Sequence, residues 1–191
     1  METLVNISGG VDSMYCAWKV LKENKEETFL LHHVLRDKNI RVRKEKTAVD
    51  SCLRYFRNEG LINFKYVENT CYKLGEGVKT IQDIEMVGIF TAIILRSFPS
   101  IKKVVISANK EDLVQGRLYD LRSKTRFETI HALSRNKEVE YLYPIKDLTK
   151  KEITKLIPRN LLKVCWSCRK PDVNGIACGK CQPCRRMSGL K

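Results

Sequence analysis

Two groups of residues in this sequence have the types and spacing to carry chemistry, and the first is a hexapeptide near the N-terminus. It combines two glycines, two hydroxyls and a carboxylate in the order Ser8-Gly9-Gly10-Val11-Asp12-Ser13. The glycines let backbone N–H groups converge on one anion, the hydroxyls add donors, and a helix beginning there adds partial positive charge. The hexapeptide therefore predicts a loop that cradles a phosphate or pyrophosphate. The alternative is an ordinary Gly-Gly turn before a helix that Asp12 or Ser13 caps.

The second group is a set of cysteines near the C-terminus. Five of the eight cysteines lie in the last segment, and four of them are separated by nine, two and two residues: Cys168, Cys178, Cys181 and Cys184. Two closely spaced CxxC steps are typical of a tetrahedral zinc ion held by four thiolates. Four protein ligands leave no open position, so the predicted role of the zinc is structural. The segment has too few apolar residues to fold by burial, and zinc would fold it outright.

Other roles for the cysteines stay open. An iron–sulfur cluster is the nearest alternative, and a disulfide or redox role is a further one that a reducing cytosol opposes. Cys165 stands outside the group of four and is either a spare thiol or an alternate ligand. Cys16 and Cys52 lie among apolar residues and are expected to be buried, inert thiols, whereas Cys71 has no predicted role.

Length and composition limit the class of protein. The chain has 191 residues, of which 43% are hydrophobic, and this suits one domain with a core of its own. No stretch approaches the roughly 20 consecutive apolar residues of a transmembrane helix. The N-terminus has neither a basic region nor a long apolar region, so a secretory signal is not expected. We therefore expect a cytoplasmic protein without a membrane-spanning segment.

The charge of the chain is strongly and unevenly positive. The formal net charge is +14, and from Thr149 onward eleven lysines and arginines face only two acidic residues. A basic surface attracts phosphate, either on a nucleotide or on a nucleic acid. Because charge alone specifies no partner, the alternative is a solvated surface that keeps the protein in solution.

Five apolar runs of strand length alternate with helical patterns of about ten residues or more. The predicted strands are residues 3–7, 28–34, 63–67, 103–108 and 139–143, and the predicted helices are residues 14–24, 43–58, 83–98, 120–136 and 149–157. This alternation predicts an α/β fold with a mostly parallel five-stranded sheet and helices on both faces. We divide the chain into a nucleotide-binding domain, residues 1–158, and a cysteine-rich zinc-binding segment, residues 159–191, packed on it. The hexapeptide follows the first strand, where open α/β sheets bind ligands.

The hexapeptide matches the SGGxDS signature of the PP-loop ATP pyrophosphatases. This resemblance implies cleavage of ATP between its α and β phosphates and adenylation of a substrate oxygen. With further segments, the chain resembles one family of that class, the 7-cyano-7-deazaguanine synthases of the queuosine pathway. Those segments are residues 41–45, 108–112, 119–122, 148–153, 166–168 and 177–184.

The chain also departs from the pattern of that family. The family has a Pro-Gly-Arg-Asn type of turn before its third helix, and residues 83–88 contain neither that arginine nor that asparagine. Leu121 stands in place of a family cysteine, and Cys165 in place of a threonine. The resemblance puts these positions near ATP or the substrate, so the exact substrate and product stay open.

The resemblance implies an ATP-dependent carbon–nitrogen ligase. It would adenylate the carboxylate of 7-carboxy-7-deazaguanine and, with ammonia, convert it through an amide into the nitrile 7-cyano-7-deazaguanine. AMP and pyrophosphate would be released. A structural zinc ion, Mg²⁺ bound with ATP, and a homodimer are further implications of the family.

Specific residues carry the implied roles. The expected ATP-binding loop consists of Ser8, Gly9, Gly10, Val11, Asp12 and Ser13. Asp12 is expected to orient the loop or the metal, and Lys150 to contact phosphate, with an exposed helix lysine as the alternative. Asp120 and Arg122 are expected to recognise the substrate, or else to form a local ion pair. Of the neighbouring His32 and His33, at most one is expected to face the nucleotide, since successive side chains of a strand alternate.

Two other functions stay open. One keeps the adenylation chemistry but ends at the amide, or transfers the deazaguanine to an amine of a protein or nucleic acid, or modifies RNA. The other is a non-catalytic zinc-ribbon protein that binds nucleic acid. The intact hexapeptide opposes this second function.

Overall fold

The computed structural model describes residues 1–36, 39–71, 83–114, 121–135 and 138–188. Within them, five strands form one sheet: β1 (Thr3–Ile7), β2 (Phe29–Arg36), β3 (Phe64–Cys71), β4 (Lys103–Val105) and β5 (Glu140–Leu142). The strands lie in the order β3-β2-β1-β4-β5, and every neighbouring pair is parallel. The predicted α/β fold with a mostly parallel five-stranded sheet is therefore confirmed.

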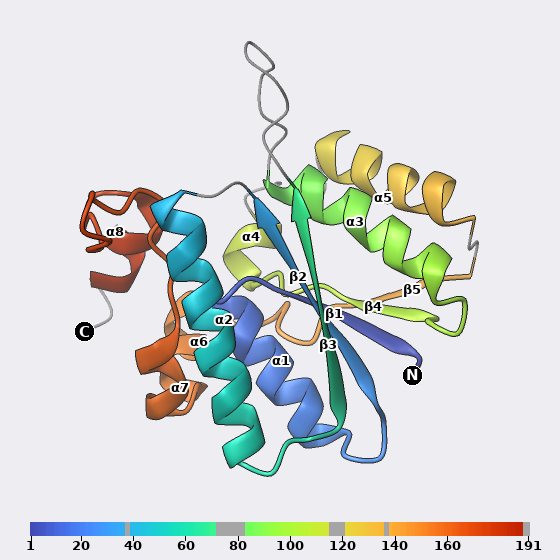
Figure 1. The fold of residues 1–191 in the computed structure, drawn as a ribbon, viewed down its shortest axis with the longest axis horizontal. Coiled ribbons are helices and arrows are strands. Elements are labelled where there is room, and N and C mark those ends of the chain that lie inside the picture. The colour runs from blue at the N-terminus through green and yellow to red at the C-terminus, as the bar shows by residue number, and fades with distance from the viewer. Residues whose placement is uncertain (37–38, 72–82, 115–120, 136–137, 189–191) are drawn as a thin grey trace.

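Helices cover both faces of this sheet. The described residues form α1 (Val11–Glu23), α2 (Ile40–Asn58), α3 (Asp83–Ser97), α4 (Lys110–Val114), α5 (Leu121–Ser134), α6 (Lys150–Leu156), α7 (Arg159–Val164) and α8 (Gln182–Ser188). Figure 1 shows α1 and α2 on one face, with α6 and α7 beside them, and α3 and α5 together on the other face. Both chain termini of the described part lie away from each other, at opposite sides of the molecule.

The sheet divides the core into two parts because neighbouring side chains of a strand point to opposite faces. On β1, Val5 belongs to the core that α1 and α2 cover, whereas Leu4 belongs to the core that α3 covers. Val105 and Val104 repeat this division on β4. All four side chains are at most 1% exposed. Burial of such a side chain stabilises the fold by about 1.5–3 kcal/mol, so each face of the sheet is stable only under its helices.

Four elements, α1, β2, α2 and β3, extend beyond their predicted bounds, and the extensions of α2 and β3 have clear causes. α2 begins at Ile40 because the Asn39 side chain accepts a hydrogen bond of 3.0 Å from the Val42 N–H and so caps the helix. β3 continues to Cys71 because it pairs with β2 along the whole length of that strand. Both extensions lie at the carboxyl edge of the sheet, next to the predicted phosphate loop.

The helices α6 and α1 begin in different ways. Thr149 and Glu152 form a capping box at the start of α6. The predicted cap of α1 by Asp12 or Ser13 is wrong, since Gly10 occupies that position and no side chain caps the helix. The Ser13 hydroxyl is engaged within the loop instead. Among the described residues, we find no helix that combines the length and the apolar character of a membrane span.

Candidate active site and metal centre

The order of the strands creates the place where the site lies. The chain leaves β1 between β2 on one side and β4 on the other, and open α/β sheets bind ligands in the crevice at such a switch point. A cleft of about 1000 Å³ opens here, lined by Ser8, Asp12 and Ser13 from the hexapeptide and by Ser107 beyond β4. That volume is at the upper end of the roughly 300–1,000 Å³ of small-molecule sites, and it can hold a nucleotide with a second substrate.

The hexapeptide packs so closely on α2 that one position requires glycine. Gly9 has a φ of +74°, and a Cβ there would lie 3.0 Å from the Glu45 carbonyl oxygen and 3.1 Å from the Ala48 Cβ. The Ser13 hydroxyl donates to the Gly10 carbonyl over 3.1 Å and accepts from the Ser8 N–H over 3.1 Å. The loop is thereby held open toward the cleft, with its shape set before any ligand binds.

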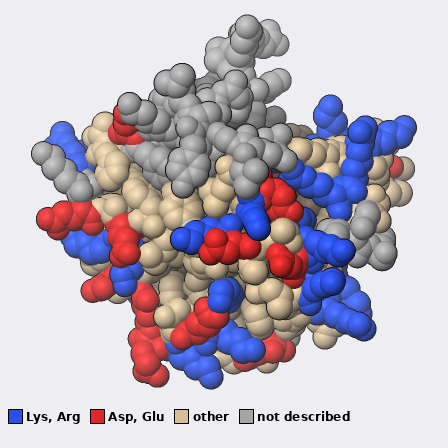
Figure 2. Space-filling model, turned by 180° about the vertical axis from the view of Figure 1, so that it is seen from behind, with Lys and Arg blue, Asp and Glu red and all other residues tan. Residues whose placement is uncertain are grey.

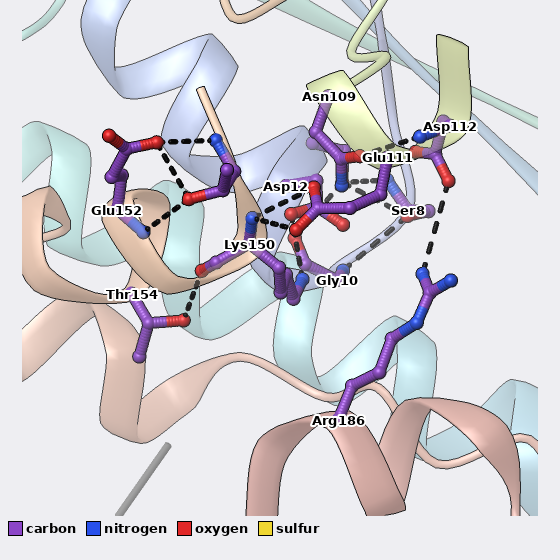
Figure 3. A network of polar contacts seen from close by, with 12 residues as sticks. Ser8, Gly10, Asp12, Asn109, Glu111, Asp112, Lys150, Glu152, Thr154 and Arg186 are labelled. Carbon is purple, nitrogen blue, oxygen red and sulfur yellow. Dashed lines mark hydrogen bonds and ion pairs between the residues drawn. The ribbon is translucent and has the colours of Figure 1, made fainter. Parts of the chain in front are cut away.

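Lys150 lies beside this loop and not on the surface. Its Nζ is 2.7 Å from the Asp12 carboxylate, and the Lys150 side chain is only 12% exposed. The Lys150 backbone N–H donates to both carboxylate oxygens of Glu111 at 3.0 Å, so α4 also positions the start of α6. Figure 3 shows Lys150 and Asp12 pointing toward each other beside Ser8 and Gly10. The structure therefore places a half-buried cation against the carboxylate of the predicted phosphate loop.

A second carboxylate–cation pair lies across the loop from the first. The Asp112 carboxylate is 4.0 Å from Nη1 of Arg186 on α8. Asn109 holds the start of α4, since its side-chain oxygen accepts from the Asp112 N–H over 2.9 Å. Burial and the neighbouring Asp12 carboxylate raise the pKa of Asp112. Sequence reasoning noted residues 108–112 only as a family segment and missed both Asp112 and Arg186.

A third charged group lines the far wall of the cleft. Arg41 donates from Nε to Glu45 over 2.7 Å and from Nη2 to Asp83 over 2.8 Å, which joins the start of α2 to the start of α3. Burial raises the pKa of Glu45, although the Arg41 guanidinium opposes this shift. At the edge of the cleft, Arg169 and Lys170 are exposed. The walls of the cleft therefore carry carboxylates paired with cations, and its rim is basic.

The two neighbouring histidines of β2 point to different faces of the sheet. His33 lines the cleft, with its Nδ1 3.7 Å from the Glu68 carboxylate. His32 points to the α3 side, where its ring nitrogens lie 2.8 Å from Asn6 Oδ1 and 2.9 Å from Asn69 Oδ1. Burial lowers the pKa of each histidine to about 4. Both rings are therefore neutral near pH 7.

The four predicted cysteine ligands come together in one group. The sulfurs of Cys168, Cys178, Cys181 and Cys184 all lie within 4.8 Å of one another. The Cys168 and Cys178 sulfurs are 3.6 Å apart, and those of Cys168 and Cys181 are 4.0 Å apart. A tetrahedral ion with bonds of about 2.3 Å requires sulfurs about 3.8 Å apart. This group could hold a single metal ion.

Backbone groups around Cys178 favour the thiolate form that metals bind. Hydrogen bonds from backbone N–H groups lower the pKa of Cys178. Burial raises the pKa of Cys184 to about 12, together with the neighbouring sulfurs of Cys181 and Cys168. Several thiolates this close repel one another. A metal cation bound among them would neutralise this negative charge.

The remaining predicted residues have different placements. Asp120 and the side chain of Arg122 lie outside the described residues. Cys165 lies apart from the group of four, packs on the core, and donates from its thiol to the Leu161 carbonyl over 3.3 Å. Cys16 and Cys52 are fully buried, as predicted. 

The segment of residues 165–188, here called the cysteine segment, forms part of the cleft. The backbone N–H of Trp166 donates to the Gly9 carbonyl over 2.8 Å, and this bond connects the segment directly to the predicted phosphate loop. Trp166 and Arg169 line the cleft from one part of the segment, and Gln182 and Arg186 line it from α8. The candidate metal centre and the candidate active site are therefore adjacent parts of one structure.

Comparisons with known proteins agree with this geometry. The family model "Queuosine biosynthesis protein QueC" matches residues 89–191, which is more than half of the chain. A solved structure, the U34-tRNA thiolase NcsA from Methanococcus maripaludis with its [4Fe-4S] cluster, is similar with a TM-score of 0.57 and 18% sequence identity. The similarity covers 87% of this chain but 58% of the thiolase chain. A search of curated proteins found no match.

The parallel sheet with an SGGxDS loop at its switch point is the architecture of a PP-loop protein. Within that class, the chain belongs to the QueC family. The predicted family is thereby confirmed.

Proposed function

We propose that this protein is an ATP-dependent ligase that converts 7-carboxy-7-deazaguanine and ammonia into 7-cyano-7-deazaguanine. One observation carries the proposal most directly. A preformed SGGxDS loop, the half-buried Lys150 and a cysteine segment of the QueC family all line the same cleft. The cleft has room for a nucleotide and a flat heterocyclic acid together.

The reaction proceeds through two adenylations. A substrate carboxylate oxygen attacks the α-phosphorus of ATP, the bond to the bridging oxygen breaks, and pyrophosphate leaves. Ammonia attacks the resulting acyl-adenylate, which expels AMP and gives the amide after loss of a proton. The amide oxygen attacks a second ATP in the same way, and loss of AMP and a proton then leaves the nitrile.

The residues of the cleft stabilise the charge that develops in these steps. Backbone N–H groups of the loop and the Ser8 hydroxyl lie where they can donate to the departing pyrophosphate. Lys150 would contact the same phosphates, since it lies within the network of the loop. The Asp12 and Asp112 carboxylates offer oxygen ligands of the kind that Mg²⁺ prefers. When bound there, Mg²⁺ would neutralise phosphate charge.

The cysteine group supports a structural zinc ion as part of the proposal. Its sulfur separations of 3.6 and 4.0 Å suit one tetrahedral ion. A [4Fe-4S] cluster, as in the thiolase, would require the four sulfurs to surround a cube of eight atoms and so to lie further apart. Metal analysis of purified protein tests this: one zinc per chain and no visible absorption are expected, whereas iron and sulfide would contradict it.

Product analysis tests the ligase itself. Purified protein is incubated with ATP and 7-carboxy-7-deazaguanine, with and without ammonium, and pyrophosphate and the modified base are measured. We expect pyrophosphate release that depends on 7-carboxy-7-deazaguanine, and a product with the mass of the nitrile. An amide as the final product would restrict the protein to the first half of the reaction. No pyrophosphate from metal-replete, folded protein would overturn the assigned substrate.

A second candidate keeps the adenylation but uses a nucleic acid as the acceptor. The basic rim of the cleft favours it, and blue side chains gather along the right-hand edge of Figure 2, on the side of the cysteine segment. Binding of a fluorescent RNA or DNA that weakens steeply with salt would support this candidate. A mass increase of that nucleic acid, dependent on ATP and the acid, would establish it.

A further inference from the structure

One short helix connects the two halves of the site. α8 carries both Cys184, which belongs to the candidate metal centre, and Arg186, which lines the cleft. Residues two positions apart on a helix point about 200° apart, hence in nearly opposite directions. The sulfur of Cys184 can therefore face the metal centre while the Arg186 guanidinium faces the phosphate loop. A metal ion that fixes the position of Cys184 would therefore also fix the position of Arg186 on the same helix.

The contact between Arg186 and Asp112 is longer than the corresponding contact of Lys150. Nη1 of Arg186 lies 4.0 Å from the Asp112 carboxylate, whereas Lys150 lies 2.7 Å from Asp12. Charge-assisted hydrogen bonds to a carboxylate measure about 2.7–2.9 Å, so the 4.0 Å contact is an ion pair without a hydrogen bond. Asp112 therefore draws Arg186 toward the loop but does not engage it closely.

The two pairs stand on either side of a loop shaped to bind phosphate (Figure 3). A triphosphate that enters the cleft brings several negative charges to the positions that both cations already approach. A planar guanidinium can donate two parallel hydrogen bonds to one phosphate. Such a contact is stronger than the 4.0 Å ion pair between Arg186 and Asp112. Mg²⁺ arriving with the nucleotide would compensate the carboxylates that the cations leave.

We propose that Arg186 is a ligand of the ATP triphosphate and that the metal bound by the four cysteines holds Arg186 in that place. The proposal rests on the ATP use within the proposed function and adds a residue and a role for the metal to it. The cysteine centre then sets the affinity of the cleft for polyphosphate as well as the fold of its own segment. Arg186 exchanges Asp112 for phosphate when ATP binds.

Ligand binding to variants of α8 tests the role of Arg186. Arg186→Ala is compared with Arg185→Ala, since Arg185 lies on the same helix but is exposed and does not line the cleft. Calorimetry measures binding of α,β-methylene-ATP, which is not cleaved at that position, and of AMP. Loss of a bidentate charged contact weakens binding of the analogue about 10- to 100-fold, while AMP changes less than about twofold. Arg185→Ala should bind both ligands as the unaltered protein does.

Metal removal tests the coupling. A chelator is applied to the unaltered protein and to Arg186→Ala, and analogue and AMP binding are measured again with circular dichroism as the check on folding. The unaltered protein should lose analogue affinity by the same factor as Arg186→Ala, and the variant should lose little more. If metal removal also abolishes AMP binding, the metal maintains the whole cleft, and its action through Arg186 is wrong.

The remaining outcomes separate this proposal from the proposed function. Equal analogue binding by the unaltered protein and Arg186→Ala would overturn the role of Arg186 and leave the ligase proposal standing. Failure of the unaltered, metal-replete protein to bind the analogue would overturn both. Arg186→Lys should restore part of the affinity, because the charge remains while the guanidinium fork is lost.

Discussion

The backbone N–H of Trp166 donates a 2.8 Å hydrogen bond to the carbonyl of Gly9. A residue next to the cysteine group is thereby bonded directly to the predicted phosphate loop. The segment that carries the candidate metal ligands is thereby part of the candidate active site. Lys44 adds a contact from α2, with its Nζ 5.7 Å from the centre of the Trp166 ring. The position of Trp166 therefore reports on where the cysteine segment lies against the loop.

Metal removal should be visible at Trp166. The chain has two tryptophans, so in Trp18→Phe protein all tryptophan emission comes from Trp166. Loss of the metal releases the cysteine segment and exposes the half-buried ring to water, so the emission of this variant should shift to longer wavelength on chelation. Trp166→Phe protein should show no comparable shift. An unchanged spectrum of the Trp18→Phe variant would show that the segment stays in place without metal.

The close packing of the loop on α2 predicts an unequal effect of two glycine substitutions. Gly9 and Gly60 have nearly the same φ, +74° and +75°, but only Gly9 has atoms within 4 Å of an added Cβ. Gly60→Ala should cost about 1–2 kcal/mol of unfolding free energy, from the backbone conformation alone. Gly9→Ala should cost roughly 2–5 kcal/mol, since overpacking adds about 1–3 kcal/mol. Urea unfolding of both variants measures the difference, and equal values would contradict the packing seen around Gly9.

Local pattern was enough to predict most of the fold. The five strands and the place of the phosphate loop follow from apolar runs and from Ser8, Gly9 and Gly10, because both signals are contained in short stretches of sequence. The four cysteines follow from spacing for the same reason. The helices α4, α7 and α8 were not predicted, since their five to seven residues show no clear helical period. The equally short α6 was predicted because the spacing of Thr149 and Glu152 marks a helix start.

The part of the candidate site that the sequence did not predict depends on contacts between residues far apart in the chain. Arg186 meets Asp112 across 74 positions of the chain, and Arg41 meets Asp83 across 42. No local pattern marks these residues, because each charge alone is indistinguishable from a solvated surface charge. Lys150 was predicted through a family resemblance, which supplied the long-range information that spacing lacks.

The position of Lys150 beside Asp12 and the loop predicts a large effect of its substitution on catalysis. Lys150→Met removes the cation that faces Asp12 and the loop, and it leaves the Asp12 carboxylate unpaired in the cleft. Loss of one such charged donor costs about 2.7–4 kcal/mol of transition-state stabilisation, so kcat/KM for pyrophosphate release should fall about 10²- to 10³-fold. Lys151→Met is the matched control, because Lys151 is exposed on the same helix. Similar kinetics of the two variants would remove Lys150 from the active site.

The two neutral histidines predict that acid destabilises the fold. Burial lowers the pKa of His32 and His33 to about 4, against about 6.5 in the unfolded chain. The unfolded state therefore binds more protons between these values, so this contribution is complete above pH 6.5 and is lost as the pH falls toward 4. Glu45 and Asp112, whose pKa values are raised, act in the opposite direction. A variant is therefore needed to separate the histidine contribution to the pH dependence of stability from that of the carboxyl groups.

His32→Gln isolates the histidine contribution, because an amide can still bond to Asn6 and Asn69 but does not titrate. Urea unfolding of this variant and the unaltered protein at several pH values between 7.5 and 4.5 gives the difference in stability. Relative to the variant, the unaltered protein should lose about 1–3 kcal/mol over that range, since one pKa unit corresponds to about 1.4 kcal/mol. A difference that does not change with pH would mean that His32 is hydrated or charged in the native state.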